Sequence, residues 1–127
     1  DGKILVLVRA DAPIANKVVR FTSAGVPDPT FGTGGIADLP DEWVGKMVVQ
    51  SDGKPVIVAV NNVHNVIRRL QVNGLLDFYA PQVDPLAVPQ AVSLGIDSTD
   101  HLLLGEEMST GGVSRFDVNG IPDPSFV

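Results

Sequence analysis

The chain has 127 residues, of which 44% are hydrophobic and 19% charged, so it has enough apolar surface for a packed core and too little charge for disorder. Its net charge is -6 and its nine basic residues are scattered, which argues against a nucleic-acid partner. Cysteine is absent, which excludes disulfides and leaves the compartment open, and apolar runs of about five to seven residues are too short for membrane insertion.

Four short apolar runs follow one another in the first 50 residues, and each is bounded by Gly, Pro, Asn or Asp. Such runs of about four to eight residues, rich in Val, Ile and Leu, predict strands. A helix is the poorer interpretation, because no long stretch repeats apolar residues at helical spacing, and 10 Pro and 13 Gly interrupt the chain. The expected strands span residues 4–8, 17–22, 35–39 and 44–50.

Short sequence motifs recur along the chain, which predicts a repeat architecture. An arginine is followed five residues later by glycine and eight residues later by aspartate, and the arginines lie 49 and 46 residues apart. An Asp-Gly-Lys word at residues 1–3 returns at 52–54, and Thr99-Asp100-His101 is its third counterpart. The recurring residues are Arg20, Gly25 and Asp28, then Arg69, Gly74 and Asp77, then Arg115, Gly120 and Asp123.

Repeats of this length with four strands each are typical of β-propeller blades. We therefore expect an all-β fold of antiparallel four-stranded blades, with about two and a half repeats in one domain. The predicted blades span residues 1–51, 52–98 and, for a partial third blade, 99–127. The chain begins and ends inside repeat words, whereas a closed propeller has about 4 to 8 blades. We therefore expect further blades, either from a longer parent chain or from copies of the same chain.

The repeated residues are best explained as structural. Gly25 follows Ser23-Ala24 and its two counterparts follow Val-Asn, so each glycine is predicted to close a hairpin at positive φ. Each aspartate then caps the turn or meets the arginine eight residues before it. A series of calcium ligands is the alternative, although one carboxylate per repeat is few for a site of roughly six to eight oxygens. The Asp-Gly-Lys word is interpreted as a turn with a solvated lysine.

The first repeat contains three characteristic motifs: Asp1-Gly2-Lys3-Ile4-Leu5-Val6, then Arg20-Phe21 with Gly25, Asp28 and Phe31-Gly32, then Gly34-Gly35-Ile36. These motifs resemble those of the delta-60 repeat family, whose members are large bacterial secreted or surface proteins with a predicted β-propeller repeat. The second repeat departs from the pattern, with Phe78-Tyr79-Ala80-Pro81 in place of the Phe-Gly segment. The resemblance implies a propeller fold and an extracellular or cell-envelope location, but no settled biochemical activity.

Sequence motifs that carry catalysis are missing. The two histidines, His64 and His101, lie outside any zinc-binding word, and no Gly-x-Ser-x-Gly elbow occurs. The adjacent pair Glu106-Glu107 is interpreted as solvated. We therefore expect no cofactor, and a non-enzymatic module that acts as a structural scaffold or binds protein or glycan. The alternative is a propeller-type hydrolase or lactonase with a metal or carboxylates at the central channel.

Positions at which the repeats differ are free to specialise, so the candidate binding surface is placed there. The loops at 9–16, 61–65 and 106–112 occupy the same place in each repeat, which predicts that they emerge on one face. Trp43 is the sole tryptophan and suits stacking on a sugar or anchoring a partner, while packing at a blade edge is the alternative. The candidate binding residues are Trp43, Asn61, Asn62, His64, Glu106 and Glu107.

The repeat also predicts shared burial, because equivalent positions face equivalent neighbours. The side chains expected inside are Ile4, Val56, Leu103, Phe21, Leu70 and Phe116. Those expected to be mostly exposed are Lys3, Lys54 and His101.

Overall fold

The computed structural model describes residues 1–10, 15–40, 43–61, 64–77, 91–106 and 112–126. In these ranges the chain is all-β with antiparallel pairing, and no helix is long and apolar enough to cross a membrane. The strands are β1 (Ile4–Val8), β2 (Asn16–Phe21), β3 (Ile36–Leu39), β4 (Trp43–Val49), β5 (Pro55–Asn61), β6 (His64–Leu70), β7 (Leu76–Asp77), β8 (Ala91–Ile96), β9 (Leu102–Glu106) and β10 (Gly112–Phe116).

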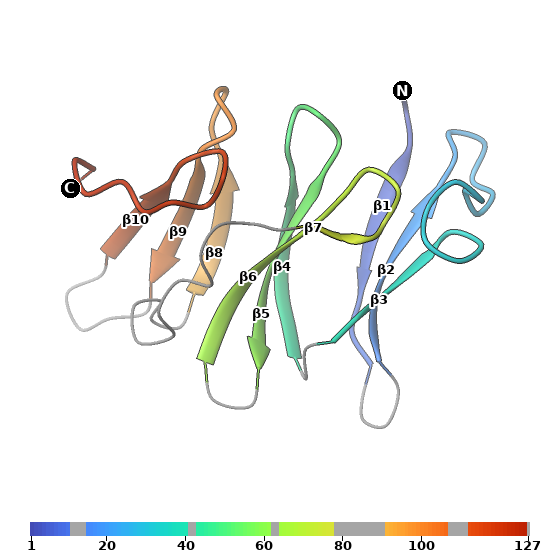
Figure 1. The fold of residues 1–127 in the computed structure, drawn as a ribbon, viewed down its shortest axis with the longest axis horizontal. Coiled ribbons are helices and arrows are strands. Elements are labelled where there is room, and N and C mark those ends of the chain that lie inside the picture. Colours follow the sequence, from blue (N-terminus) through green and yellow to red (C-terminus); the bar gives the residue numbers. More distant parts are fainter. Residues whose placement is uncertain (11–14, 41–42, 62–63, 78–90, 107–111, 127) are drawn as a thin grey trace.

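Three antiparallel sheets stand side by side (Figure 1). The first sheet has the strand order β1-β2-β3, the second β4-β5-β6-β7 and the third β10-β9-β8. The arrangement agrees with stacked blades, although the sheets contain three, four and three strands among the described residues.

The pairing corrects the expected grouping of the strands. The run near 44–50 was expected to be the fourth strand of the first blade, but β4 pairs with β5 in the second sheet. A tight turn explains this difference: the Gln50 N–H bonds the Lys54 carbonyl at 2.9 Å, and Gly53 has φ +86°. Two strands joined by so short a turn form a hairpin. The sequence repeat therefore begins inside a hairpin rather than at the edge of a sheet.

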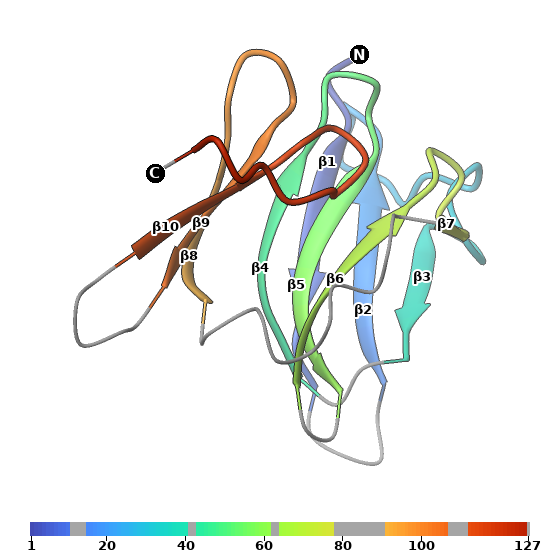
Figure 2. The same cartoon turned by 60° about the vertical axis from the view of Figure 1, so that its left-hand side comes forward.

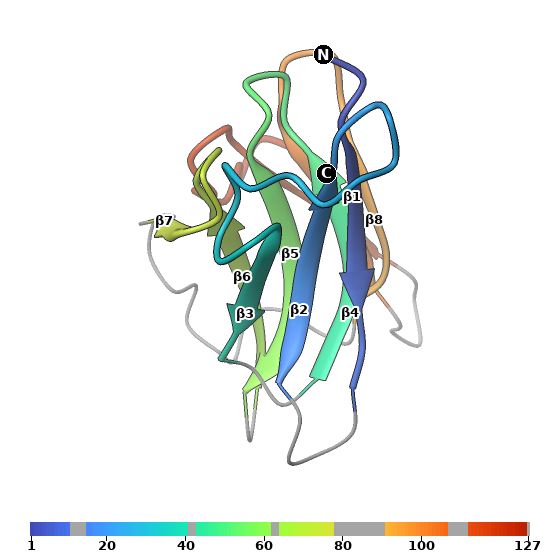
Figure 3. The same cartoon turned by 90° about the vertical axis from the view of Figure 1, so that its right-hand side faces the viewer.

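Two apolar layers hold the three sheets together. Figures 2 and 3 show the arrangement of the sheets from two further directions. The first layer lies between the first and second sheets, and the second layer lies between the second and third. Buried residues of the first layer are Val18, Phe31, Ala37, Leu39, Ile57, Ala59, Val66 and Leu70. Those of the second layer are Val56, Val58, Leu102, Leu104 and Phe116. The middle sheet is thus covered on both faces, which accounts for the uninterrupted burial of β5 from Pro55 to Ala59.

Burial follows these layers rather than the repeat alone. Val56, Leu70 and Phe116 are buried as expected. The expectation for Ile4 is wrong, because its side chain is 50% exposed on the outer face of the first sheet. Phe21 and Leu103 are only half-buried, since they also lie on outer faces of the stack. Lys3 is exposed as expected, whereas Lys54 and His101 are half-buried.

Candidate functional site

Arg20 and Asp28 form a buried ion pair in the first sheet. Their exposed fractions are 4% and 3%, and Arg20 Nε donates to Asp28 Oδ2 at 2.9 Å. Arg20 Nη2 donates to the Thr30 hydroxyl at 3.0 Å, and the guanidinium lies 4.5 Å from the centroid of the Phe31 ring. Because Asp28 N–H also bonds the Arg20 carbonyl, the two residues sit opposite each other across the hairpin.

The same ion pair recurs in the other two sheets. Arg69 Nε donates to Asp77 Oδ2 at 2.8 Å, and Arg115 Nε donates to Asp123 Oδ2 at 2.9 Å. The contact predicted from the eight-residue spacing is therefore confirmed in all three repeats. Gly25, Gly74 and Gly120 have φ of +78°, +87° and +83°, as the predicted turns require.

Hydrogen bonds within the turn lower the pKa of two of these carboxylates, those of Asp28 and Asp123. The Thr30 hydroxyl and N–H donate to Asp28 Oδ1 at 2.7 and 3.0 Å, and they lower the pKa of Asp28 well below its usual value, with Lys3 and Arg20 adding to the effect. The Ser125 hydroxyl, followed by Arg115, lowers the pKa of Asp123 to about 2. The Asp28 and Asp123 carboxylates are thus surrounded by N–H and O–H donors and a guanidinium.

The arginines also reach the neighbouring sheet, which the sequence analysis did not foresee. Arg20 Nη1 donates to the carbonyl oxygen of Val72, and Arg69 Nη1 donates to the carbonyl oxygen of Val118 at 3.0 Å. We call this arrangement the inter-sheet clamp: an arginine paired with an aspartate of its own sheet and bonded to a turn carbonyl of the next. The buried Gln50 donates to the same Val118 oxygen at 3.0 Å. One sequence signal was available: Val72 and Val118 both lie two residues before a repeated glycine.

The lysine of the Asp-Gly-Lys motif also belongs to this network, although Lys3 is exposed as expected. Lys3 Nζ lies 3.3 Å from Asp28 Oδ2, and Lys54 Nζ lies 3.9 Å from Asp77 Oδ2. His101 holds the third position but pairs instead with Asp97, at 3.0 Å.

In the third repeat, Thr99-Asp100-His101 stands in place of Asp-Gly-Lys and forms a different turn. Asp97 accepts hydrogen bonds from the Thr99 hydroxyl and from the N–H groups of Thr99 and His101. These bonds, the Thr99 hydroxyl first, hold the pKa of Asp97 well below its usual value. Asp100 replaces the turn glycine at φ +64°, and its carboxylate accepts hydrogen bonds from the Ser51 N–H and hydroxyl at 2.8 and 2.6 Å. Asp100 thereby ties the third sheet to the second.

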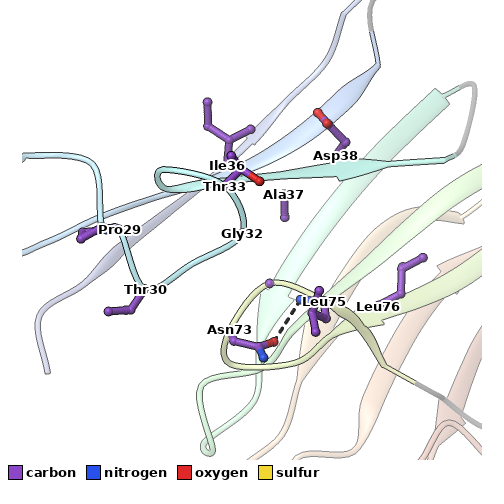
Figure 4. A pocket seen from close by; sticks show the side chains of 11 residues that line it. Pro29, Thr30, Gly32, Thr33, Ile36, Ala37, Asp38, Asn73, Leu75 and Leu76 are labelled. Carbon is purple, nitrogen blue, oxygen red and sulfur yellow. Dashed lines mark hydrogen bonds between the residues drawn. The ribbon is translucent and has the colours of Figure 1, made fainter.

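An open groove of about 540 Å³ lies between the first two sheets (Figure 4). One side is the segment from Pro29 to Asp38, and the other is the turn from Asn73 to Leu76. Gly32 N–H bonds the Asn73 carbonyl at 2.7 Å, which ties the two sides together. The Leu75 and Leu76 side chains at the groove are 61% and 53% exposed.

The predicted binding residues fall at strand ends along one edge of the stack. β1, β5 and β9 end along the lower edge in Figure 1, and we call this the lower edge. Trp43 begins β4 opposite Val60, while Asn61 and His64 pair across the β5–β6 hairpin. Glu106 ends β9 in the third sheet. Asn62 and Glu107 lie outside the described residues. In the described ranges, no group of three or more His, Asp or Glu is placed to hold a metal ion.

The comparisons with known proteins address the first repeat. Residues 1–31 match the model of a β-propeller domain of unknown function, DUF5122. This match supports a β-propeller repeat family. It covers the Asp-Gly-Lys word, the Arg20–Asp28 pair and the Gly25 turn. The comparison with curated proteins gave no match, and neither did the comparison with solved structures.

Proposed function

We propose that the chain is a non-enzymatic β-propeller repeat module of a secreted or cell-surface protein that presents its lower edge to a protein or glycan. This proposal rests on one contrast. The charged residues that recur in the repeats make contacts within and between sheets, whereas the candidate binding residues, which do not recur, lie at strand ends where the structure describes them. The clamp arginines illustrate the first half, because Arg20 and Arg69 each bond an aspartate and a carbonyl of the next sheet.

The lower edge offers chemistry suited to such a ligand. Pairing of β4, β5 and β6 brings the backbones of Trp43, Asn61 and His64 to neighbouring positions. Indole rings stack on sugar faces and anchor protein partners, and amide side chains both donate and accept hydrogen bonds. The extracellular or cell-envelope location rests on the resemblance to delta-60 repeat proteins.

Binding to defined oligosaccharides and to purified extracellular-matrix proteins tests this function. For a bound probe, we expect Trp43→Ala and His64→Ala each to weaken binding at least about tenfold, while Ser98→Ala, an exposed change in a turn at the opposite edge, leaves it unchanged. Thermal unfolding of each variant checks that its fold is intact.

Three outcomes would count against the proposal. The first is binding to no probe. The second is binding that survives both lower-edge changes but is lost in Leu75→Lys, which would move the site to the groove. The third is turnover of a lactone or glycoside by the purified chain, which would favour the hydrolase alternative.

A further inference from the structure

The two interfaces inside the chain are built in the same way. Between the first and second sheets, the Gly74 turn fits against Phe31, so closely that a Cβ at Gly74 would lie 3.2 Å from the Phe31 ring. Arg20 bonds the carbonyl of Val72 in that turn. Between the second and third sheets, Arg69 bonds the carbonyl of Val118, and Gly120 of the same turn is buried. Each interface therefore seats a glycine turn against the arginine of the preceding sheet.

The outer face of the third sheet repeats the receiving half of this interface. Arg115 pairs with Asp123 and lies 4.7 Å from the centroid of the Phe126 ring. Arg20 makes the equivalent contacts with Asp28 and with the Phe31 ring. A pocket of about 140 Å³ opens there, lined in part by Arg115, Asp123 and Phe126. The Arg115 side chain is 29% exposed, against 5% for Arg20 and 9% for Arg69.

The outer face of the first sheet presents the inserting half. Gly25 is exposed, and a Cβ added to it would meet nothing within 4 Å, whereas Gly74 and Gly120 are buried. Ile4 and Val6 are 50% and 40% exposed on this face. Their repeat equivalents, Pro55 and Ile57 in the second sheet and Leu102 and Leu104 in the third, are fully buried.

We propose that a second copy of this chain docks head to tail, with the Gly25 turn of one copy seated in the Arg115–Phe126 pocket of the other. Arg115 then donates to the backbone carbonyl of Ser23, which lies two residues before Gly25 as Val72 and Val118 lie before their glycines. Val113, which is 55% exposed, and Leu103 cover Ile4 and Val6. The interface joins two different faces, so successive copies form a ring or an open chain. This inference does not depend on the ligand of the lower edge.

Two blocked variants test the inference, because each removes one of the two faces. Val6→Lys blocks the face of the first sheet, and Val113→Lys blocks that of the third. Both positions are exposed, so we expect both proteins to fold. In light scattering, the unmodified chain should form oligomers, and each variant alone should be a 13.4 kDa monomer. An equimolar mixture should form a heterodimer through the two intact faces.

The control is Val49→Lys, which changes a 41% exposed valine of the middle sheet and should leave oligomers unchanged. Arg115→Lys in the Val6→Lys chain should weaken the heterodimer about tenfold, because lysine lacks the fork that bonds a carboxylate and a carbonyl together. An unmodified chain that stays monomeric at high concentration would overturn the proposal. So would a homodimer of either blocked variant, or a mixture that stays monomeric.

Discussion

The Arg20 guanidinium donates a hydrogen bond to the carbonyl oxygen of Val72, 52 residues away in the next sheet, while its Nε holds Asp28 of its own sheet. A single buried side chain thus fixes both a hairpin and the distance between two sheets. Arg69 repeats both contacts. A planar guanidinium with five donors can serve two acceptors at once, which an ammonium on a flexible stem does poorly. This requirement explains why arginine recurs at the position.

Replacing Arg20 by methionine should destabilise the protein more than the same change at Arg115. Arg20→Met leaves the buried Asp28 with Lys3 as its remaining cation and Val72 without its donor, so we expect the unfolding equilibrium constant to rise on the order of a hundredfold. The Arg115 side chain is 29% exposed, and among the described residues it bonds no carbonyl of another sheet. Urea unfolding measures both effects, and equal losses would show that the bond between sheets contributes nothing.

Acid should destabilise the folded chain, and Asp123 should account for part of the effect. A carboxylate whose pKa is lowered by folding stabilises the protein above its unfolded-state pKa, near 3.9, and this stabilisation disappears as pH falls through the folded value. For Asp123 the folded pKa is about 2. Asp123→Asn should therefore lower the urea midpoint at pH 7, and this difference should shrink between about pH 4 and pH 2.

The control for the pH dependence is Asp38→Asn. The Asp38 side chain is 69% exposed and lies 3.5 Å from Lys17, so its removal should change the midpoint little. A constant difference between wild type and Asp123→Asn from pH 7 to pH 2 would contradict the assigned role of the Asp123 carboxylate.

The sequence predicts contacts inside one hairpin well and contacts between sheets poorly. The Arg20–Asp28 pair and the turn at Gly25 are local, because spacing along a hairpin determines which residues face each other. The bond from Arg20 to Val72 depends on how two sheets stack, and no periodicity in the chain encodes that distance. The exposure of Ile4 was missed for the same reason. Its repeat position predicts burial, but burial also requires a neighbouring sheet.

Phe116 and Phe21 provide a test of that distinction, because they hold the same repeat position. Phe116 is 3% exposed between the second and third sheets, whereas Phe21 is half-buried on the outer face of the first. Phe116→Ala should lower the free energy of unfolding by about 3–5 kcal/mol. Phe21→Ala should cost clearly less, since fewer contacts are lost. Equal losses of unfolding free energy for the two variants in urea would mean that the position in the repeat determines the contribution of the phenylalanine, whether or not a neighbouring sheet covers it.

Gly74 and Gly25 separate the backbone requirement of the turn from its packing against the next sheet. Both have positive φ, so alanine at either position costs roughly 1–2 kcal/mol in backbone strain. At Gly25 a Cβ meets nothing within 4 Å, and we expect no further cost. At Gly74 a Cβ would lie 2.8 Å from the Gly32 nitrogen. The first and second sheets must then separate, which weakens the Gly32–Asn73 hydrogen bond and the packing of Phe31.

Gly74→Ala should therefore cost about 3 kcal/mol or more in total, against about 1–2 kcal/mol for Gly25→Ala. Both changes are best measured by urea unfolding in a chain that also carries Val6→Lys and Val113→Lys, so that association of copies does not contribute. Hydrogen exchange at the Gly32 amide gives a second readout, since this amide should lose protection in Gly74→Ala and keep it in Gly25→Ala. Equal destabilisation of the two variants, with unchanged protection of the Gly32 amide, would show that Gly74 is required only for the conformation of its own turn. The greater loss at Gly74 would instead show that the repeated glycine also sets the spacing between sheets.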